Sequence, residues 1–124
     1  MPVKKIKNIL IVEDDRPIAK ALKLKLEKSG FAAEMCFDGE EAMVAMKKKK
    51  FDLILLDLMM PKKDGFSFLS EVKPKKLKIP IIVLSNLGQE EDLQKAKDLG
   101  AVGYFVKSNT PIADVISYVR KKLA

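Results

Sequence analysis

Short apolar runs recur along the chain and alternate with segments of helical period. Four of the runs contain no polar residue, which is typical of strands covered on both faces of a parallel sheet. They occupy residues 9–12, 53–56, 81–84 and 104–106. A fifth run, at residues 32–36, carries Glu34 in its middle and therefore indicates an edge strand.

Apolar residues at helical spacing follow each expected strand. The sets are Ile18, Ala19, Leu22 and Leu26; Ala42, Ala45 and Met46; Phe66, Leu69 and Val72; Leu93, Ala96 and Leu99; and Ile112, Val115, Ile116, Val119 and Leu123. We expect Thr110 to be the N-cap and Pro111 the first residue of the last helix, and Gly30 and Gly100 to stand at helix C-caps. Strict βα alternation predicts an α/β fold, a doubly wound five-stranded parallel sheet with helices on both faces.

Length and cysteine content indicate one domain in a reducing compartment. A chain of 124 residues is long enough to bury a core as a single domain, residues 1–124. The single Cys36 has no partner for an internal disulfide, and the sequence shows neither a signal peptide nor an apolar run long enough to span a bilayer. We therefore expect a cytoplasmic protein with no membrane partner.

The positive charge does not by itself indicate nucleic-acid binding. The net charge is +7, but of 24 basic residues only Arg16 and Arg120 are arginine, the side chain that recognises bases and phosphates in bidentate fashion. A solvated lysine-rich surface is the simpler interpretation, and direct nucleic-acid binding is not favoured. Histidine is absent, which excludes histidine acid/base catalysis and the usual zinc sites.

Polar side chains stand at the ends of four of the expected strands. Residues 13–15 (Glu-Asp-Asp) follow the first strand, Asp57 the third, residues 85–86 (Ser-Asn) the fourth and Lys107 the fifth. In a doubly wound sheet, ligands bind outside the carboxyl ends of the strands. We therefore expect these acids, the hydroxyl and the lysine to converge on one rim.

The converging acids predict a divalent metal and a phosphoryl acceptor. Each pair of carboxylates among Glu13, Asp14 and Asp57 at roughly 5 Å costs about 3 kcal/mol at an effective dielectric of about 20. Lys107 offsets one of the negative charges, and a divalent cation would neutralise the rest. A site made only of oxygen ligands favours Mg²⁺. A carboxylate is an accepted nucleophile for phosphoryl groups, so Asp57 could form an acyl phosphate whose oxygens Lys107 and Ser85 bind. The alternative, that these acids only cap helices, accounts for one acid better than for the whole set.

Four motifs resemble the signatures of bacterial response-regulator receiver domains and together cover essentially the whole chain. They are Ile9-Leu-Ile-Val-Glu-Asp-Asp15, Asp57-Leu-Met-Met-Pro-Lys-Lys-Asp-Gly65, Leu84-Ser85 and Gly100-Ala-Val-Gly-Tyr-Phe-Val-Lys107. The resemblance implies the flavodoxin-like strand order 2-1-3-4-5 and a place in a two-component system. A histidine kinase or histidine phosphotransfer protein would then donate a phosphoryl group to Asp57.

The resemblance also implies roles for single residues. These are the metal ligands Glu13 (through water), Asp14, Asp57 and Met59 (through its backbone carbonyl), the phosphoryl-binding residues Ser85 and Lys107, and the switch residues Ser85 and Tyr104. For Tyr104, packing against a sheet edge is the alternative. The implied protein is no enzyme beyond its own phosphoryl transfer and dephosphorylation, needs Mg²⁺ as its cofactor, and binds a downstream protein through its fourth helix, fifth strand and fifth helix.

The sequence departs from the family pattern in three respects. Asn86 stands where the family has a small residue, Ser108 replaces the proline after the lysine, and residues 102–103 (Val-Gly) replace the acidic pair of many dimerising DNA-binding regulators. Because a cis peptide costs roughly 2.5–4 kcal/mol before serine and only about 0.5–1 kcal/mol before proline, we expect the Lys107–Ser108 bond to be trans. We expect a stand-alone, chemotaxis-regulator-like protein or a receiver from a longer chain. A phosphorylation-independent interaction module of the same fold is the alternative function.

Overall fold

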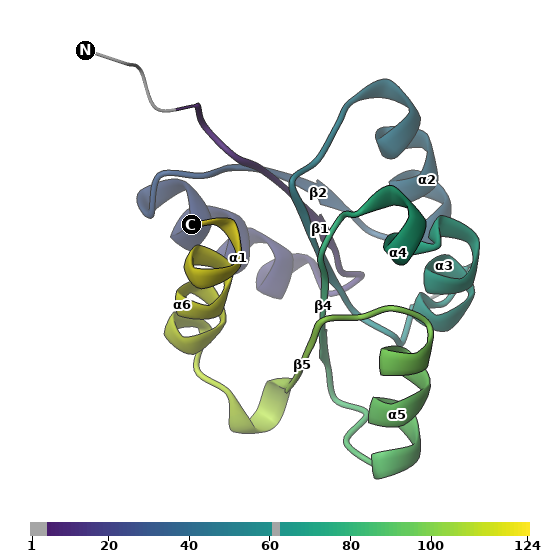
Figure 1. The fold of residues 1–124 in the computed structure, drawn as a ribbon. Helices are drawn as coiled ribbons and strands as arrows, with labels where there is room; N and C mark the ends of the chain where they lie inside the picture. Colours follow the sequence, from purple (N-terminus) through teal and green to yellow (C-terminus); the bar gives the residue numbers. More distant parts are fainter. Residues whose placement is uncertain (1–4, 61–62) are drawn as a thin grey trace.

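A five-stranded parallel sheet forms the centre of the protein (Figure 1). The computed structural model describes residues 5–60 and 63–124, so Pro61 and Lys62 of the second motif lie outside the described residues. In spatial order the strands are β2 (Ala32–Cys36), β1 (Asn8–Val12), β3 (Leu53–Leu56), β4 (Ile81–Ser85) and β5 (Gly103–Val106). All pairings between them are parallel. The expected order 2-1-3-4-5 and the edge position of β2 are confirmed.

Helices cover both faces of this sheet. On one face lie α1 (Arg16–Lys28) and α6 (Ile112–Leu123), and on the other lie α2 (Gly39–Lys48), α3 (Gly65–Val72) and α5 (Glu90–Asp98) (Figure 1). A 3₁₀ turn, η1 (Lys107–Asn109), joins β5 to α6. The expected doubly wound α/β architecture is confirmed.

A short helix that the sequence pattern did not predict lies between α3 and β4. This helix, α4 (Pro74–Leu77), has four residues and is too short to show an amphipathic period. Lys73 and Lys78 stand at its two ends with φ of 51° and 57°. The left-handed region is costly for residues other than glycine, so the surrounding chain must hold both ends in place. The fourth and fifth expected helices are consequently α5 and α6.

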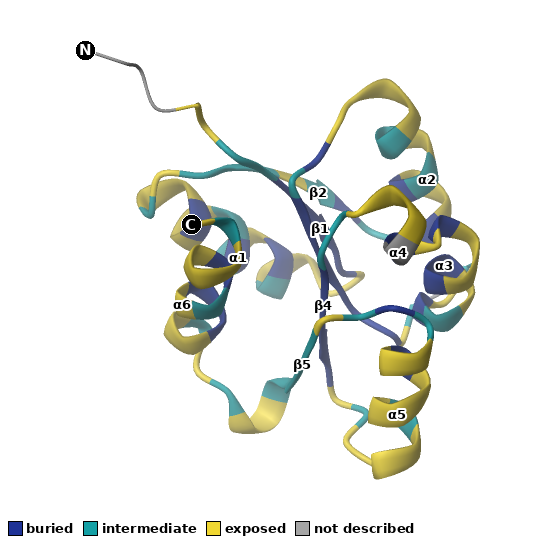
Figure 2. Ribbon diagram, in the orientation of Figure 1, coloured by how far each residue is buried: buried dark blue, intermediate teal, exposed yellow. Residues whose placement is uncertain are grey.

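The central strands are buried from both sides, which explains their uninterrupted apolar sequences. In β1, Ile9 and Ile11 pack with α1 and α6, whereas Leu10 and Val12 pack with α2, α3 and α5. All four are fully buried, and Figure 2 shows the same burial along the middle of the sheet. Because side chains alternate along a strand, each central strand contributes to two separate cores.

The edge strand β2 combines an exposed acid with a buried thiol. Glu34 is exposed in the middle of the strand, and Cys36 is buried at its end. Burial, reinforced by nearby carboxylates, raises the pKa of the Cys36 thiol to about 12. The thiol is therefore neutral at physiological pH and has little nucleophilic character.

Helix ends follow the expected signals with one difference. Gly30 and Gly100 follow α1 and α5 with φ of 96° and 109°, the left-handed conformation expected just beyond a helix. The expectation for the start of α6 is wrong by one residue. Pro111 is the N-cap because its ψ of 145° is still extended, which leaves Ile112 as the first helical residue and Thr110 outside the cap.

Aspartate side chains cap the three helices that follow β1, β2 and β3. The N–H groups of Ile18, Glu41 and Ser67 donate to Asp15, Asp38 and Asp64 at 3.2, 2.9 and 2.8 Å respectively. Each cap satisfies a backbone donor that the first turn of a helix would otherwise leave unpaired. Three loops around the carboxyl ends of the strands are thus fixed by their own sequence.

The start of α3 lies directly against the end of β3. A Cβ atom on Gly65 would lie 2.6 Å from the carbonyl oxygen of Asp57 and 2.6 Å from Cα of Leu58. The N–H of Gly65 donates to the carbonyl of Leu58 at 3.0 Å. Only a residue without a side chain allows this approach, so Gly65 helps to set the position of the Asp57 backbone.

We expect Gly65→Ala to lower the free energy of unfolding by about 1–3 kcal/mol, because both clashing atoms belong to the backbone and must move. Gly88→Ala is the matched control, since its Cβ would meet only Val106 side-chain atoms at 3.5 Å or more. Urea unfolding followed by circular dichroism measures both changes. Equal stability of the two variants would show that the contact between α3 and β3 is unimportant.

Candidate functional site

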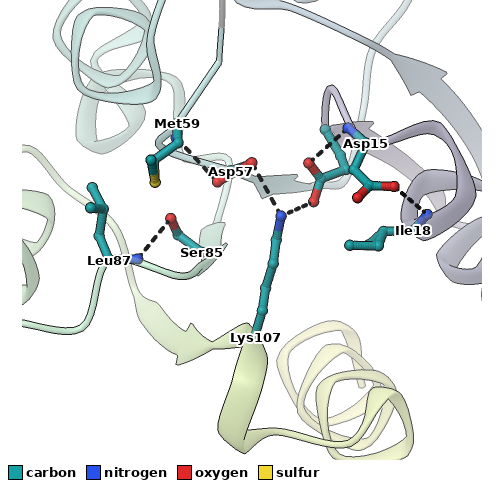
Figure 3. A network of polar contacts seen from close by, with 8 residues as sticks. Asp15, Ile18, Asp57, Met59, Ser85, Leu87 and Lys107 are labelled. Atoms are coloured by element: carbon teal, nitrogen blue, oxygen red, sulfur yellow. Dashed lines mark hydrogen bonds and ion pairs between the residues drawn. The ribbon is translucent and has the colours of Figure 1, made fainter.

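Two buried carboxylates meet at the carboxyl ends of β1 and β3. Glu13 follows β1 and Asp57 follows β3, and the two residues are only 2% and 4% exposed. Lys107, at the end of β5, reaches both: its Nζ contacts Oε1 of Glu13 and lies 3.2 Å from Oδ2 of Asp57 (Figure 3). The structure thus brings together side chains from three strand ends.

Backbone N–H groups hold the same two carboxylates from the other side. The N–H of Met59 donates to Oδ1 of Asp57 at 3.1 Å, and that of Asp15 donates to Oε2 of Glu13 at 3.2 Å. The N–H of Asp57 donates in turn to the last carbonyl of β1 at 2.9 Å. Each carboxylate therefore has one oxygen on the backbone and the other on Lys107, which fixes its orientation.

Asp14 completes a cluster of oxygen ligands. It is exposed, and carboxylate oxygens of Glu13, Asp14 and Asp57 lie within 4.8 Å of one another. Hard divalent cations prefer such oxygen donors, and Mg²⁺ in particular binds one or two carboxylates while retaining water. Met59 lies beside the cluster with an exposed side chain. The ligand set therefore fits Mg²⁺.

Burial controls the protonation of Glu13. Burial raises the pKa of Glu13 to about 7, with help from Asp57, although the hydrogen bond with Lys107 lowers it. Burial alone would lower the pKa of Lys107, but Glu13 and Asp57 together raise it. Near neutral pH the site therefore contains a charged lysine beside a carboxylate that still binds a proton part of the time.

Ser85 and Tyr104 are connected through the backbone of Leu87. Ser85 is fully buried at the end of β4, and its Oγ accepts a hydrogen bond from the N–H of Leu87 at 3.4 Å (Figure 3). The carbonyl of Leu87 accepts from the hydroxyl of Tyr104, and burial raises the pKa of that hydroxyl to about 12. Asn86 lies between the two bonded residues and is exposed.

The segment after Lys107 takes the expected course. The Lys107–Ser108 peptide bond is trans, since no peptide bond in the described ranges is cis. Residues 107–109 form η1, and the N–H of Thr110 donates to the carbonyl of Lys107 at 3.5 Å. With this backbone Lys107 still reaches Asp57, as we expected.

Comparison with known proteins assigns the chain to a family. The family described as "Response regulator receiver domain" matches residues 9–119. The chain belongs to this family. This receiver domain is 44% identical over 109 residues to a gliding motility regulatory protein of Myxococcus xanthus, which covers 86% of the chain and 14% of the relative. It is 38% identical over 105 residues to the alkaline phosphatase synthesis transcriptional regulatory protein PhoP of Bacillus subtilis. This match covers 85% of the chain and 44% of the relative.

The receiver domain spans less than half the length of these two relatives. Among solved structures it matches the receiver domain of a Francisella response regulator with a TM-score of 0.87 and 31% identity, over 94% of this chain and 95% of the other. A CheY-like receiver domain protein of Methanospirillum hungatei gives a TM-score of 0.89 and 25% identity, over 96% of this chain and 94% of the other.

In residues 5–60 and 63–124, each helix is too short or too polar to cross a membrane.

The sequence interpretation missed the backbone partners of the site. The N–H groups of Asp15, Met59 and Leu87 and the carbonyl of Leu87 hold the side chains described above. Residue type carries no signal for such contacts, because every residue except proline offers the same backbone donor and acceptor. Asp15 alone had a recognisable signal, as an aspartate one residue before a helix.

We expect Glu13 to make the metal-free protein less stable as pH rises from about 4.5 to about 7. In that range the folded state binds a proton at Glu13 that the unfolded state has lost, so stability falls with increasing pH, by up to about 3 kcal/mol in total. Urea unfolding in chelator at about pH 5 and about pH 8 should show this loss in the wild type and not in Glu13→Gln. Glu27→Gln, which removes an exposed carboxylate from α1, should keep the loss. An identical pH dependence of all three proteins would contradict the assignment.

Proposed function

We propose that Asp57 accepts a phosphoryl group in a Mg²⁺-dependent reaction from the histidine of a histidine kinase or phosphotransfer protein. The observation that supports this most is the placement of Asp57 at a rigid strand end beside Glu13, Asp14 and Lys107. Receiver domains in general bind Mg²⁺ at an acidic pocket, and the oxygen cluster here fits that ion. We propose no cofactor-binding loop, and no enzyme activity beyond the domain's own phosphoryl transfer and dephosphorylation.

In the proposed reaction, an oxygen of Asp57 attacks phosphorus and the bond to the donor nitrogen breaks. Glu13, Asp14 and Asp57, with the backbone carbonyl of Met59, would hold the metal, which supplies positive charge to the transferred group. Lys107 stabilises the charge of the acyl phosphate from the other side. No general base is needed, because the attacking carboxylate is already ionised. The residues present are therefore sufficient for the transfer.

Ser85, Leu87 and Tyr104 form the proposed switch. In the structure the hydroxyl of Ser85 accepts from Leu87, whose carbonyl accepts from Tyr104. A phosphoryl group on Asp57 brings a charge of about −1.5 to −2 and strong acceptors, which would draw the Ser85 hydroxyl away as a donor. Leu87 would then be released, and the loop that holds Tyr104 could move. The face made by α5, β5 and α6 would change and bind a downstream protein.

Residues 1–124 would form one receiver domain that acts in the cytoplasm. Its partners are a histidine kinase or phosphotransfer protein and a downstream protein, and direct nucleic-acid binding is not proposed. A phosphorylation-independent interaction module remains the second candidate. The phosphoacceptor function is favoured because the chain has all three acids of the cluster, Glu13, Asp14 and Asp57, together with Lys107. A binding module would not need this cluster of charges.

We expect acetyl phosphate with Mg²⁺ to add one phosphoryl group to the protein, and Asp57→Asn to abolish the addition because the amide is not a nucleophile. Asp15→Asn is the matched control. It changes a neighbouring aspartate at the same rim while retaining an N-cap side chain. Intact-mass spectrometry measures the adduct. Equal modification of the Asp57→Asn variant would exclude Asp57 as the acceptor.

We expect Mg²⁺ to bind more tightly at about pH 8 than at about pH 6, because the metal competes with the proton on Glu13. Asp14→Asn should weaken binding by at least roughly tenfold, whereas Asp114→Asn, on the exposed side of α6, should leave it unchanged. Amide NMR titration follows both. A Mg²⁺ response that survives in Asp14→Asn would remove Asp14 from the ligand set and favour the interaction module.

A further inference from the structure

Among the described residues, basic side chains outnumber acidic ones at the end of the sheet where the strands begin, although Glu27, Asp52 and Asp98 also lie there. At the carboxyl ends lie the acidic cluster, the capping aspartates and the acidic first turns of α2 and α5. At the opposite end, the last turns of α1, α2, α5 and α6 all carry lysine or arginine, three of them in α6 alone. We call this opposite end, where strands begin and helices end, the amino rim. The C-terminus lies on this side of the molecule (Figure 1).

Charge at helix ends has an ordinary explanation, but it does not account for the whole amino rim. Cations in a last turn interact favourably with the helix dipole. Lys49, Lys73 and Lys78 also stand at helix ends, as the C-caps of α2, α3 and α4. Two other exposed lysines of this rim lie beyond any helix cap, because Lys5 precedes β1 and Lys50 precedes β3. The dipole of a neighbouring helix gives no reason for these two positions to be lysine.

The two ends of α4 are the most informative positions of this rim. Lys73 and Lys78 both have a positive φ, a conformation that glycine or asparagine adopts at much lower cost. Lysine is nevertheless present at both. A residue kept in an unfavourable conformation points to a requirement for its side chain, and the side chain here supplies an exposed positive charge.

Exposed aliphatic side chains lie among these lysines. Ile6, between Lys5 and Lys7, is 61% exposed, and Leu77, just before Lys78, is 53% exposed. In α4, Lys76 and Leu77 are exposed, whereas Pro74 is buried, and Figure 2 draws the exposed part of this helix in yellow. Three aromatic residues lie nearest this rim. Phe51 is buried, whereas Phe31 and Tyr118 are half-buried. The surface therefore offers lysine and isolated aliphatic groups, and it lacks exposed rings among the described residues.

This composition separates the possible partners. Protein interfaces are depleted of lysine and enriched in aromatic residues and arginine. Single-stranded nucleic acid needs aromatic platforms. Base recognition in duplex DNA relies above all on arginine, of which this chain has only two. An anionic bilayer attracts lysines through its surface potential and accepts aliphatic side chains at the boundary between headgroups and acyl chains.

We propose that the amino rim is a docking surface for an anionic lipid bilayer. Lysines from the helix ends and from the segments before β1 and β3 face the headgroups, and Ile6 and Leu77 enter the boundary region. The strands place Asp57 at the other end of the sheet, so a docked receiver domain presents its acceptor site to the aqueous phase. The expectation of no membrane partner considered only segments that span a bilayer, whereas this surface exists only after folding gathers separate lysines.

Vesicle sedimentation with the full chain tests the proposal. We expect the protein to sediment with phosphatidylcholine vesicles that contain about one-third phosphatidylserine, and not with pure phosphatidylcholine, in a salt-dependent manner. The rim variant Lys50→Gln/Lys76→Gln/Lys121→Gln should lower the partition coefficient by on the order of 100-fold, at about fivefold per lysine. The control Lys20→Gln/Lys23→Gln/Lys63→Gln removes the same charge away from the rim and should change it by less than roughly fivefold.

A second pair of variants tests the aliphatic contribution. Ile6→Ser/Leu77→Ser should weaken vesicle binding several-fold, whereas Val44→Ser, at an exposed valine of α2, should not. The proposal is overturned by absence of binding to anionic vesicles, by equal loss in the two lysine variants, or by tighter binding to random-sequence duplex DNA at equal phosphate concentration. The last result would assign the rim to nucleic acid. Phosphorylation at Asp57 is measured separately, so failure here leaves that proposal intact.

Discussion

Repulsion between buried carboxylates is the constraint on which the rest of this structure depends. Glu13 and Asp57 stand at the ends of adjacent strands, almost excluded from water, and two such charges at close range are strongly unfavourable. Two features of the protein bear on this: Lys107 bridges both groups, and burial, with a smaller contribution from Asp57, raises the pKa of Glu13 to about 7. A divalent cation would provide a third response, and binding would then release the proton.

The fold is what makes this arrangement stable enough to persist. The strands that carry the carboxylates are covered on both faces, so their ends cannot separate without exposing two hydrophobic cores. Aspartate caps hold the loops, and Gly65 lets α3 approach the backbone of Asp57. Stability gained in the apolar layers therefore offsets the electrostatic cost at the rim.

Sequence alone predicted the parts of the molecule that depend on residue type and period. The uninterrupted apolar runs predicted the strands of the sheet, and the glycines after α1 and α5 predicted two helix ends. The polar residues at strand ends predicted which side chains meet at the rim. The strand order came from the family resemblance. Helix α4 and the start of α6 were not predicted, because four residues carry no period and because sequence signals place a helix end only to within one or two residues. The links through the backbone of Leu87 needed coordinates, since they depend on backbone position.

The buried thiol of Cys36 has a practical consequence for spectroscopy. Because its pKa is raised to about 12, the thiolate that reacts with maleimides is almost absent at neutral pH. A cysteine introduced at an exposed position such as Ser117 on α6 would then be labelled selectively in the native chain. Since the protein contains no tryptophan, a single fluorophore at that position could follow movements of the α6 surface without a competing indole signal.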